Sequence, residues 1–149
     1  PRWAFALYWR IDGQPLWESR IIFQYLQRKH EKTALSLEEE NIVSAIDTLQ
    51  DQLIQPFLMQ RFGHAVDRGN GYFERVAERQ RLILSYLEKQ IEAGLLARWD
   101  YPAMSLYSML DWATFRKLLP VPTLDSALDR FVKGCAQQQL VAETDPRLA

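Results

Sequence analysis

The sequence predicts a mainly α-helical protein in which a small β-hairpin and one helix precede an all-helical bundle. A β-branched and aromatic run at residues 7–11 is joined to a second short run, 14–17, by Asp12-Gly13, which is the strongest short signal for a hairpin. From residue 36 onward, apolar side chains recur at helical spacing. At 149 residues the chain is long enough for one compact domain.

The hairpin is followed by a helix that begins at Glu18-Ser19. Its basic end, residues 28–30, suits the negative pole of a helix. Its apolar side chains fall on one face, and they are Ile21, Ile22, Tyr25 and Leu26. We therefore assign residues 1–30 to a small α/β piece, which is too little to fold alone, and residues 31–35 to a linker.

Two long helices are expected next. Ser36 and Glu39 form a capping box that starts the first of them, and Pro56 predicts a kink in it. The second covers residues 72–93, and Gly94 is a natural left-handed stop. Its inward side chains are expected to be Tyr72, Val76, Ile83, Leu87 and Ile91.

Two further helices complete the predicted bundle, residues 36–149. Asp100, followed by a proline in the first turn, caps the first of these, which is expected to continue through Leu119. Thr123 is expected to cap the last helix, which runs to about Gln139.

Composition excludes several classes of function. The single cysteine, Cys135, rules out an internal disulfide framework and a multi-thiolate zinc site, and it indicates a cytoplasmic protein in which this residue is packed. The two histidines, His30 and His64, lie far apart, so no metal is expected. A net charge of −1 gives no general field for nucleic acid. No apolar run approaches the ~20 residues of a membrane span, so no membrane partner is expected.

Residues 12–26, DGQPLWESRIIFQYL, followed by a linker and helices, resemble cytosolic glutathione S-transferases of the bacterial type. In that family this stretch forms the third and fourth strands and third helix of a thioredoxin-like domain. Leu110-Asp111-Trp112 ahead of Phe115-Arg116 is similar to the family's C-terminal helical domain. The resemblance implies that residues 1–30 are the C-terminal remnant of the thioredoxin-like glutathione-binding domain and that residues 36–149 are the helical domain.

The resemblance implies an enzyme that transfers the thiolate of its co-substrate glutathione to small hydrophobic electrophiles. Ser19 would offer helix-start N–H groups and a hydroxyl to the γ-glutamyl carboxylate, and Glu18 is implied to take the ammonium group. The family's thiol-activating residue would lie upstream of Pro1, so no catalytic residue is expected in this chain. On spacing alone, Ser19 reads more simply as an N-cap and Glu18 as an acid favoured by the helix dipole.

The resemblance also implies a homodimer and a hydrophobic substrate pocket that the helical domain helps to line. The candidates for this pocket are Phe57, Phe62, Tyr107 and Phe115. On spacing alone, aromatic residues in helical stripes belong to the core. Two alternatives stay open: a non-catalytic transferase-like module for protein association, and the product of a truncated or mis-started reading frame that aggregates or swaps segments.

Overall fold

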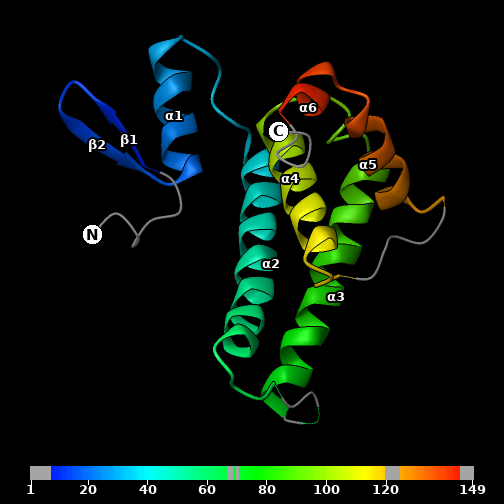
Figure 1. Cartoon of the computed structure of the whole chain (residues 1–149). Coiled ribbons are helices and arrows are strands. Elements are labelled where there is room, and N and C mark those ends of the chain that lie inside the picture. The colour runs from blue at the N-terminus through cyan, green and yellow to red at the C-terminus, as the bar shows by residue number, and fades with distance from the viewer. Residues whose placement is uncertain (1–7, 67–68, 70, 120–124, 145–149) are drawn as a thin grey trace. The chain divides into compact units, whose positions relative to one another are not determined.

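The computed structural model describes residues 8–66, 69, 71–119 and 125–144. This part of the protein is mainly helical, with six helices and one small antiparallel sheet of two strands, which confirms the predicted class (Figure 1). The chain divides into two compact units, residues 1–37 and 38–149. None of the described helices is long and apolar enough to cross a membrane.

The first unit contains the predicted hairpin. Strands β1 (Tyr8–Ile11) and β2 (Gln14–Trp17) are antiparallel, and each residue of β1 lies opposite one of β2. Asp12 and Gly13 connect them with φ values of 48° and 79°. Two positive φ values are what a tight two-residue hairpin turn requires, so this prediction is confirmed.

Helix α1 (Ser19–Lys29) packs against β2 within the same unit. Ile22 is buried there, but Ile21, which we expected on the same face, is 47% exposed. In the described chain α1 packs mainly against β2, so its apolar face is covered along a narrow line. Trp9 and Trp17 on the hairpin are also exposed.

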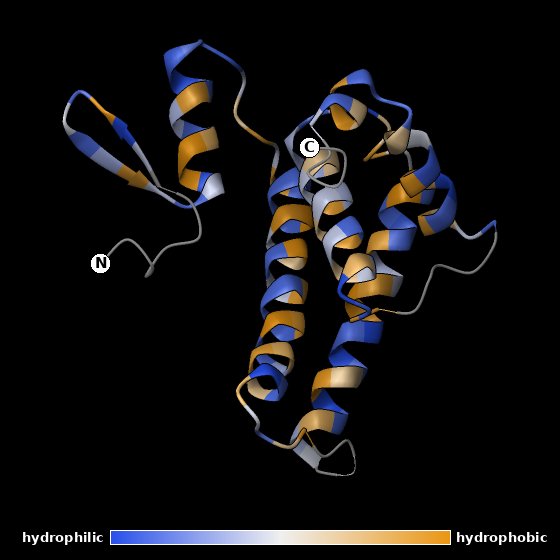
Figure 2. Cartoon of the chain, in the orientation of Figure 1, coloured by the Kyte–Doolittle hydropathy of each residue, from blue (hydrophilic) through white to orange (hydrophobic). Residues whose placement is uncertain are grey.

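The second unit is the helical bundle. Its helices are α2 (Leu37–Arg61), α3 (Gly71–Glu92), α4 (Tyr101–Phe115), α5 (Ala127–Ala136) and the short α6 (Gln139–Glu143). Helix α2 begins directly after Ser36 and continues through Pro56. Hydrophobic stripes on α2 and its neighbours, visible in Figure 2, meet in one core. The largest side chains fully buried in it are Ile42, Ile46, Leu49, Leu87 and Leu106.

Four helices end in the same hydrogen-bonded motif. In each case the second residue past the end of the helix has positive φ. Its amide donates to the carbonyl three residues back, and the amide of the next residue donates to the carbonyl five residues back. This residue is Glu31 after α1, Gly63 after α2, Gly94 after α3 and Lys117 after α4. The stop predicted at Gly94 is confirmed. The helix expected to reach Leu119 ends earlier, because Lys117 turns left-handed.

Two other expectations for the bundle are wrong. Tyr72 is 56% exposed, because it lies in the first turn of α3 while the α3 side chains packed on the core begin at Ile83. The predicted cap Thr123 lies outside the described residues, and the last long helix begins only at Ala127. Its N-cap is Ser126, whose Oγ accepts a hydrogen bond from the third residue of the helix at 3.1 Å.

Candidate functional site

The first candidate site is the junction between β2 and α1. Because β2 ends at Trp17 and α1 starts at Ser19, Glu18 alone makes the bend. Its backbone has φ 67° and ψ 141°, in the half of conformational space that favours glycine. Such a conformation costs a residue with a side chain about 1–3 kcal/mol and is concentrated at functional positions. The sequence gives no sign of this strain.

The electrostatics of this junction favour one anion and one cation. The first hydrogen bond of α1 runs from the amide of Ile22 to the carbonyl of Glu18 at 3.1 Å, so no carbonyl within the helix can accept from the amides of residues 19–21. These N–H groups and the helix dipole attract an anion, and the exposed Ser19 adds a hydroxyl. The exposed Glu18 carboxylate has no bonding partner among the described residues and can take a cation.

The second candidate site is an aromatic cluster in the helical unit. Phe57 of α2 meets Trp112 of α4 edge to face, with ring centroids 6.3 Å apart. The guanidinium of Arg116 lies 5.8 Å from the centroid of the Phe57 ring and 5.2 Å from that of Phe115. Two of the predicted pocket residues, Phe57 and Phe115, are thus brought together around a cation. We call Phe57, Trp112, Phe115 and Arg116 the aromatic–arginine cluster.

The other two predicted pocket residues lie elsewhere. Tyr107 is 9% exposed and belongs to the core, where its ring meets Trp99 edge to face at 6.0 Å. Phe62 follows the end of α2, is 74% exposed and makes no ring contact with the cluster. The resemblance that suggested all four residues does not distinguish inward from outward positions.

Sequence reasoning missed Trp112 and Arg116 as members of a site. Their spacing with Phe115 carries the signal, because residues three and four apart share one face of a helix. Trp112 lies three residues before Phe115 and four before Arg116, so the spacing places these three residues near one another but does not bring them to Phe57.

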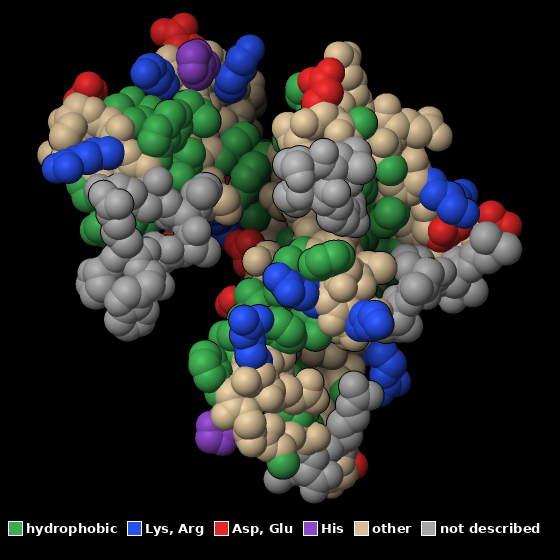
Figure 3. Space-filling model, viewed as in Figure 1, with side chains coloured by type: hydrophobic (Ala, Val, Ile, Leu, Met, Phe, Trp, Pro, Cys, Tyr) green, Lys and Arg blue, Asp and Glu red, His purple; other side chains and the backbone are tan. Residues whose placement is uncertain are grey.

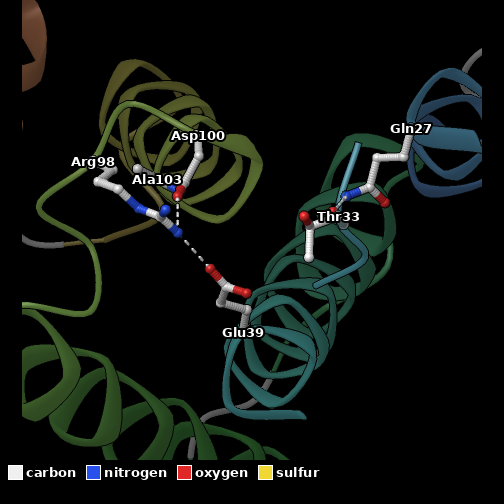
Figure 4. Close-up of polar contacts among 6 residues, drawn as sticks. All are labelled: Gln27, Thr33, Glu39, Arg98, Asp100 and Ala103. Carbon is white, nitrogen blue, oxygen red and sulfur yellow. Dashed lines mark hydrogen bonds and ion pairs between the residues drawn. The ribbon is translucent and has the colours of Figure 1, made fainter. Parts of the chain in front are cut away.

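The start of α4 is fixed by an ionic network. Asp100 caps the helix, since its Oδ1 accepts from the amide of Ala103 at 3.5 Å, and this confirms the predicted N-cap. Figure 4 shows Arg98 reaching both Asp100, at 3.2 Å, and Glu39 of α2, at 2.9 Å. Exposed pairs of this kind contribute only about 0–1 kcal/mol each. Their value here is geometric, because they tie the helix that carries most of the cluster to α2.

A polar contact also fixes the segment after α1. Figure 4 shows Gln27, whose Nε2 donates to the carbonyl of Thr33 at 2.9 Å. This hydrogen bond folds part of the predicted linker, residues 31–35, back against the end of α1.

The remaining reactive residues suggest no further chemistry. Burial raises the pKa of the Cys135 thiol to about 11, so this residue is protonated near neutral pH and unreactive. Among the residues that the structure describes, no group of three or more His, Cys, Asp or Glu side chains could hold a metal ion.

Comparison with known proteins finds no match. No family model matches the sequence, and neither a curated protein nor a solved structure is significantly similar to the chain.

Proposed function

We propose that the chain is a fragment of a cytoplasmic glutathione S-transferase of the bacterial type, a homodimer that transfers the glutathione thiolate to small hydrophobic electrophiles. The observation that carries the proposal is the strained Glu18 backbone, directly ahead of Ser19 at the start of α1. A hairpin, one helix and then a helical bundle is the order expected for the end of a thioredoxin-like domain followed by the transferase helical domain.

In this proposal the junction of β2 and α1 holds the γ-glutamyl end of glutathione. That end is a zwitterion, so its two charges need two opposite partners. The carboxylate accepts from the N–H groups at the start of α1 and from the Ser19 hydroxyl, while Glu18 pairs with the ammonium group. Charge-assisted hydrogen bonds are short and directional, so they also orient the peptide.

The chemistry requires that the thiol of glutathione ionise, because the thiolate is the nucleophile. The resemblance assigns this ionisation to a residue that the chain does not contain, and no catalytic residue is assigned here. The chain's own contribution is to bind one end of glutathione. The aromatic–arginine cluster supplies apolar surface for the electrophile.

A thermal melt with and without about 10 mM glutathione tests the proposal, because a ligand that binds only the folded state raises its stability. We expect a rise in Tm for the wild-type chain. Ser19→Ala removes a hydrogen bond to a charge and should weaken binding by about 1–3 kcal/mol.

Ser126→Ala is the matched control, since it removes a serine at the start of another helix, α5. It should lower the melting temperature but keep the glutathione-induced rise. An unchanged rise in Ser19→Ala would refute the site, and no rise in a folded wild-type sample would refute glutathione binding.

One observation favours the alternative of a non-catalytic transferase-like module for protein association. Hydrophobic side chains gather on the visible face of the first unit in Figure 3, and Trp9, Trp17 and Ile21 are among its exposed residues. Exposed apolar surface of this kind marks protein interaction sites. A folded chain that binds no glutathione but forms a defined complex through this face would support the alternative.

A further inference from the structure

We propose that the aromatic–arginine cluster binds planar aromatic anions, with an aryl carboxylate as the simplest case. This deepens the proposed function, on which it rests for its catalytic meaning, because it says that an accepted electrophile would carry an aromatic ring with an anionic group that the cluster binds. The binding itself involves only residues of the helical unit and requires no glutathione.

The rings of the cluster are arranged around one cation. Phe57 on α2 and Phe115 on α4 both lie within cation–π distance of one guanidinium, that of Arg116. Trp112 supports Phe57 from the side. Because Phe115 is 57% exposed, much of its surface remains available for a flat ligand.

The positive charge of the cluster has no carboxylate partner among the described residues. In the described part of the chain, neither Arg116 nor Lys117 forms an ion pair with a carboxylate, although both are exposed. Other cations of the bundle do find acids, as Lys133 does with Asp129 at 2.8 Å. A guanidinium that rests on aromatic rings keeps its N–H edge for a ligand, and this planar fork matches both oxygens of a carboxylate.

A second cation, Lys117, lies in a strained backbone position beside the cluster. Lys117 has φ 57°, at the position where α2 and α3 are followed by Gly63 and Gly94. A lysine here adds a second cation next to Arg116 at a cost in backbone energy. Figure 3 shows Lys and Arg side chains interspersed with hydrophobic ones over the lower part of the bundle.

Calorimetric titration of the full chain with 2-naphthoate and with its neutral analogue 2-naphthamide, without glutathione, tests the proposal. We expect the wild-type chain to bind the carboxylate about tenfold more tightly than the amide, as a charge-assisted hydrogen bond predicts. Arg116→Gln should remove this preference, and Arg116→Lys should keep part of it because the charge remains. Phe57→Leu should weaken both ligands.

Arg79→Gln is the matched control, because Arg79 is an exposed arginine on α3 outside the cluster. It should leave the preference unchanged. Equal binding of the two ligands, no saturable binding, or the same loss in Arg79→Gln would overturn the proposal. A failure of glutathione binding, which the Ser19→Ala melt reports separately, would leave naphthoate binding in place but remove its interpretation as substrate selection.

Discussion

The left-handed backbone at Lys117 allows the energetic cost of the helix-end motif to be measured. The residues after α3 and α4 occupy the same place in the same motif: Gly94 has φ 79° and Lys117 has φ 57°. At these two helix ends the chain meets one geometric requirement first with the residue that adopts positive φ freely and then with a residue that does not. We expect glycine to be more stable than alanine at both positions.

The magnitude follows from two opposing terms. A side chain in the left-handed region costs about 1–2 kcal/mol, whereas glycine loses about 0.5–1 kcal/mol more through its flexible unfolded state. The balance favours glycine over alanine by about 0.5–1 kcal/mol. A Cβ added at Gly94 would meet no atom within 4 Å, so no steric clash adds to the backbone term there. Comparing Lys117→Gly with Lys117→Ala removes the charge from both variants and leaves only the backbone term.

Urea unfolding followed by far-ultraviolet circular dichroism measures these differences. Lys117→Gly should be more stable than Lys117→Ala, and Gly94→Ala should be less stable than wild type by a similar amount. A free energy of unfolding for Lys117→Ala that equals or exceeds that of Lys117→Gly would refute the backbone strain at this position. Because Lys117→Gly also removes a cation beside Arg116, we expect it to weaken 2-naphthoate binding while the backbone relaxes.

Three further predictions concern packing, pH and reactivity. Leu106→Ala should destabilise the bundle by about 2–5 kcal/mol in urea unfolding because the side chain is fully buried, whereas Met104→Ala on the exposed side of α4 should cost far less. The hydrogen bond from Lys133 lowers the pKa of Asp129, so the stabilisation that the Asp129 carboxylate gives is present above the ordinary pKa of 3.8 and is lost as pH falls through the lowered pKa. The difference in unfolding free energy between the wild type and Asp129→Asn should therefore shrink as pH falls through that range. A difference that grows would contradict this. The Cys135 thiol should resist a thiol reagent at pH 8 in the folded chain and react in urea, and fast reaction in the folded chain would contradict its burial.

Much of the fold could be predicted because its local signals are strong. Asp12-Gly13 supplies both positive φ values of the hairpin, and Asp100 and Gly94 mark a helix start and a helix end. The end of α4 was missed because a lysine gives no sign of left-handed geometry. Tyr72 was placed inward because a helical stripe gives the face of a helix but does not show where along it the packing begins.

The candidate sites were predicted only in part, for related reasons. The pair Glu18 and Ser19 follows from a local pattern, but the positive φ of Glu18 appears only in the structure. Phe57 and Phe115 were both candidates for the pocket that the resemblance implies, whereas the cation that joins them, Arg116, depends on packing between helices far apart in the sequence. Tertiary contacts of this kind leave no periodic trace.

The most direct test of the glutathione site is a nuclear magnetic resonance titration of the isotope-labelled chain with glutathione. The account predicts that the backbone amides of Ser19, Arg20 and Ile21 shift most, because these are the N–H groups at the start of α1 that would bind the γ-glutamyl carboxylate. Saturation with the largest shifts elsewhere, or no shift at these three amides, would contradict it.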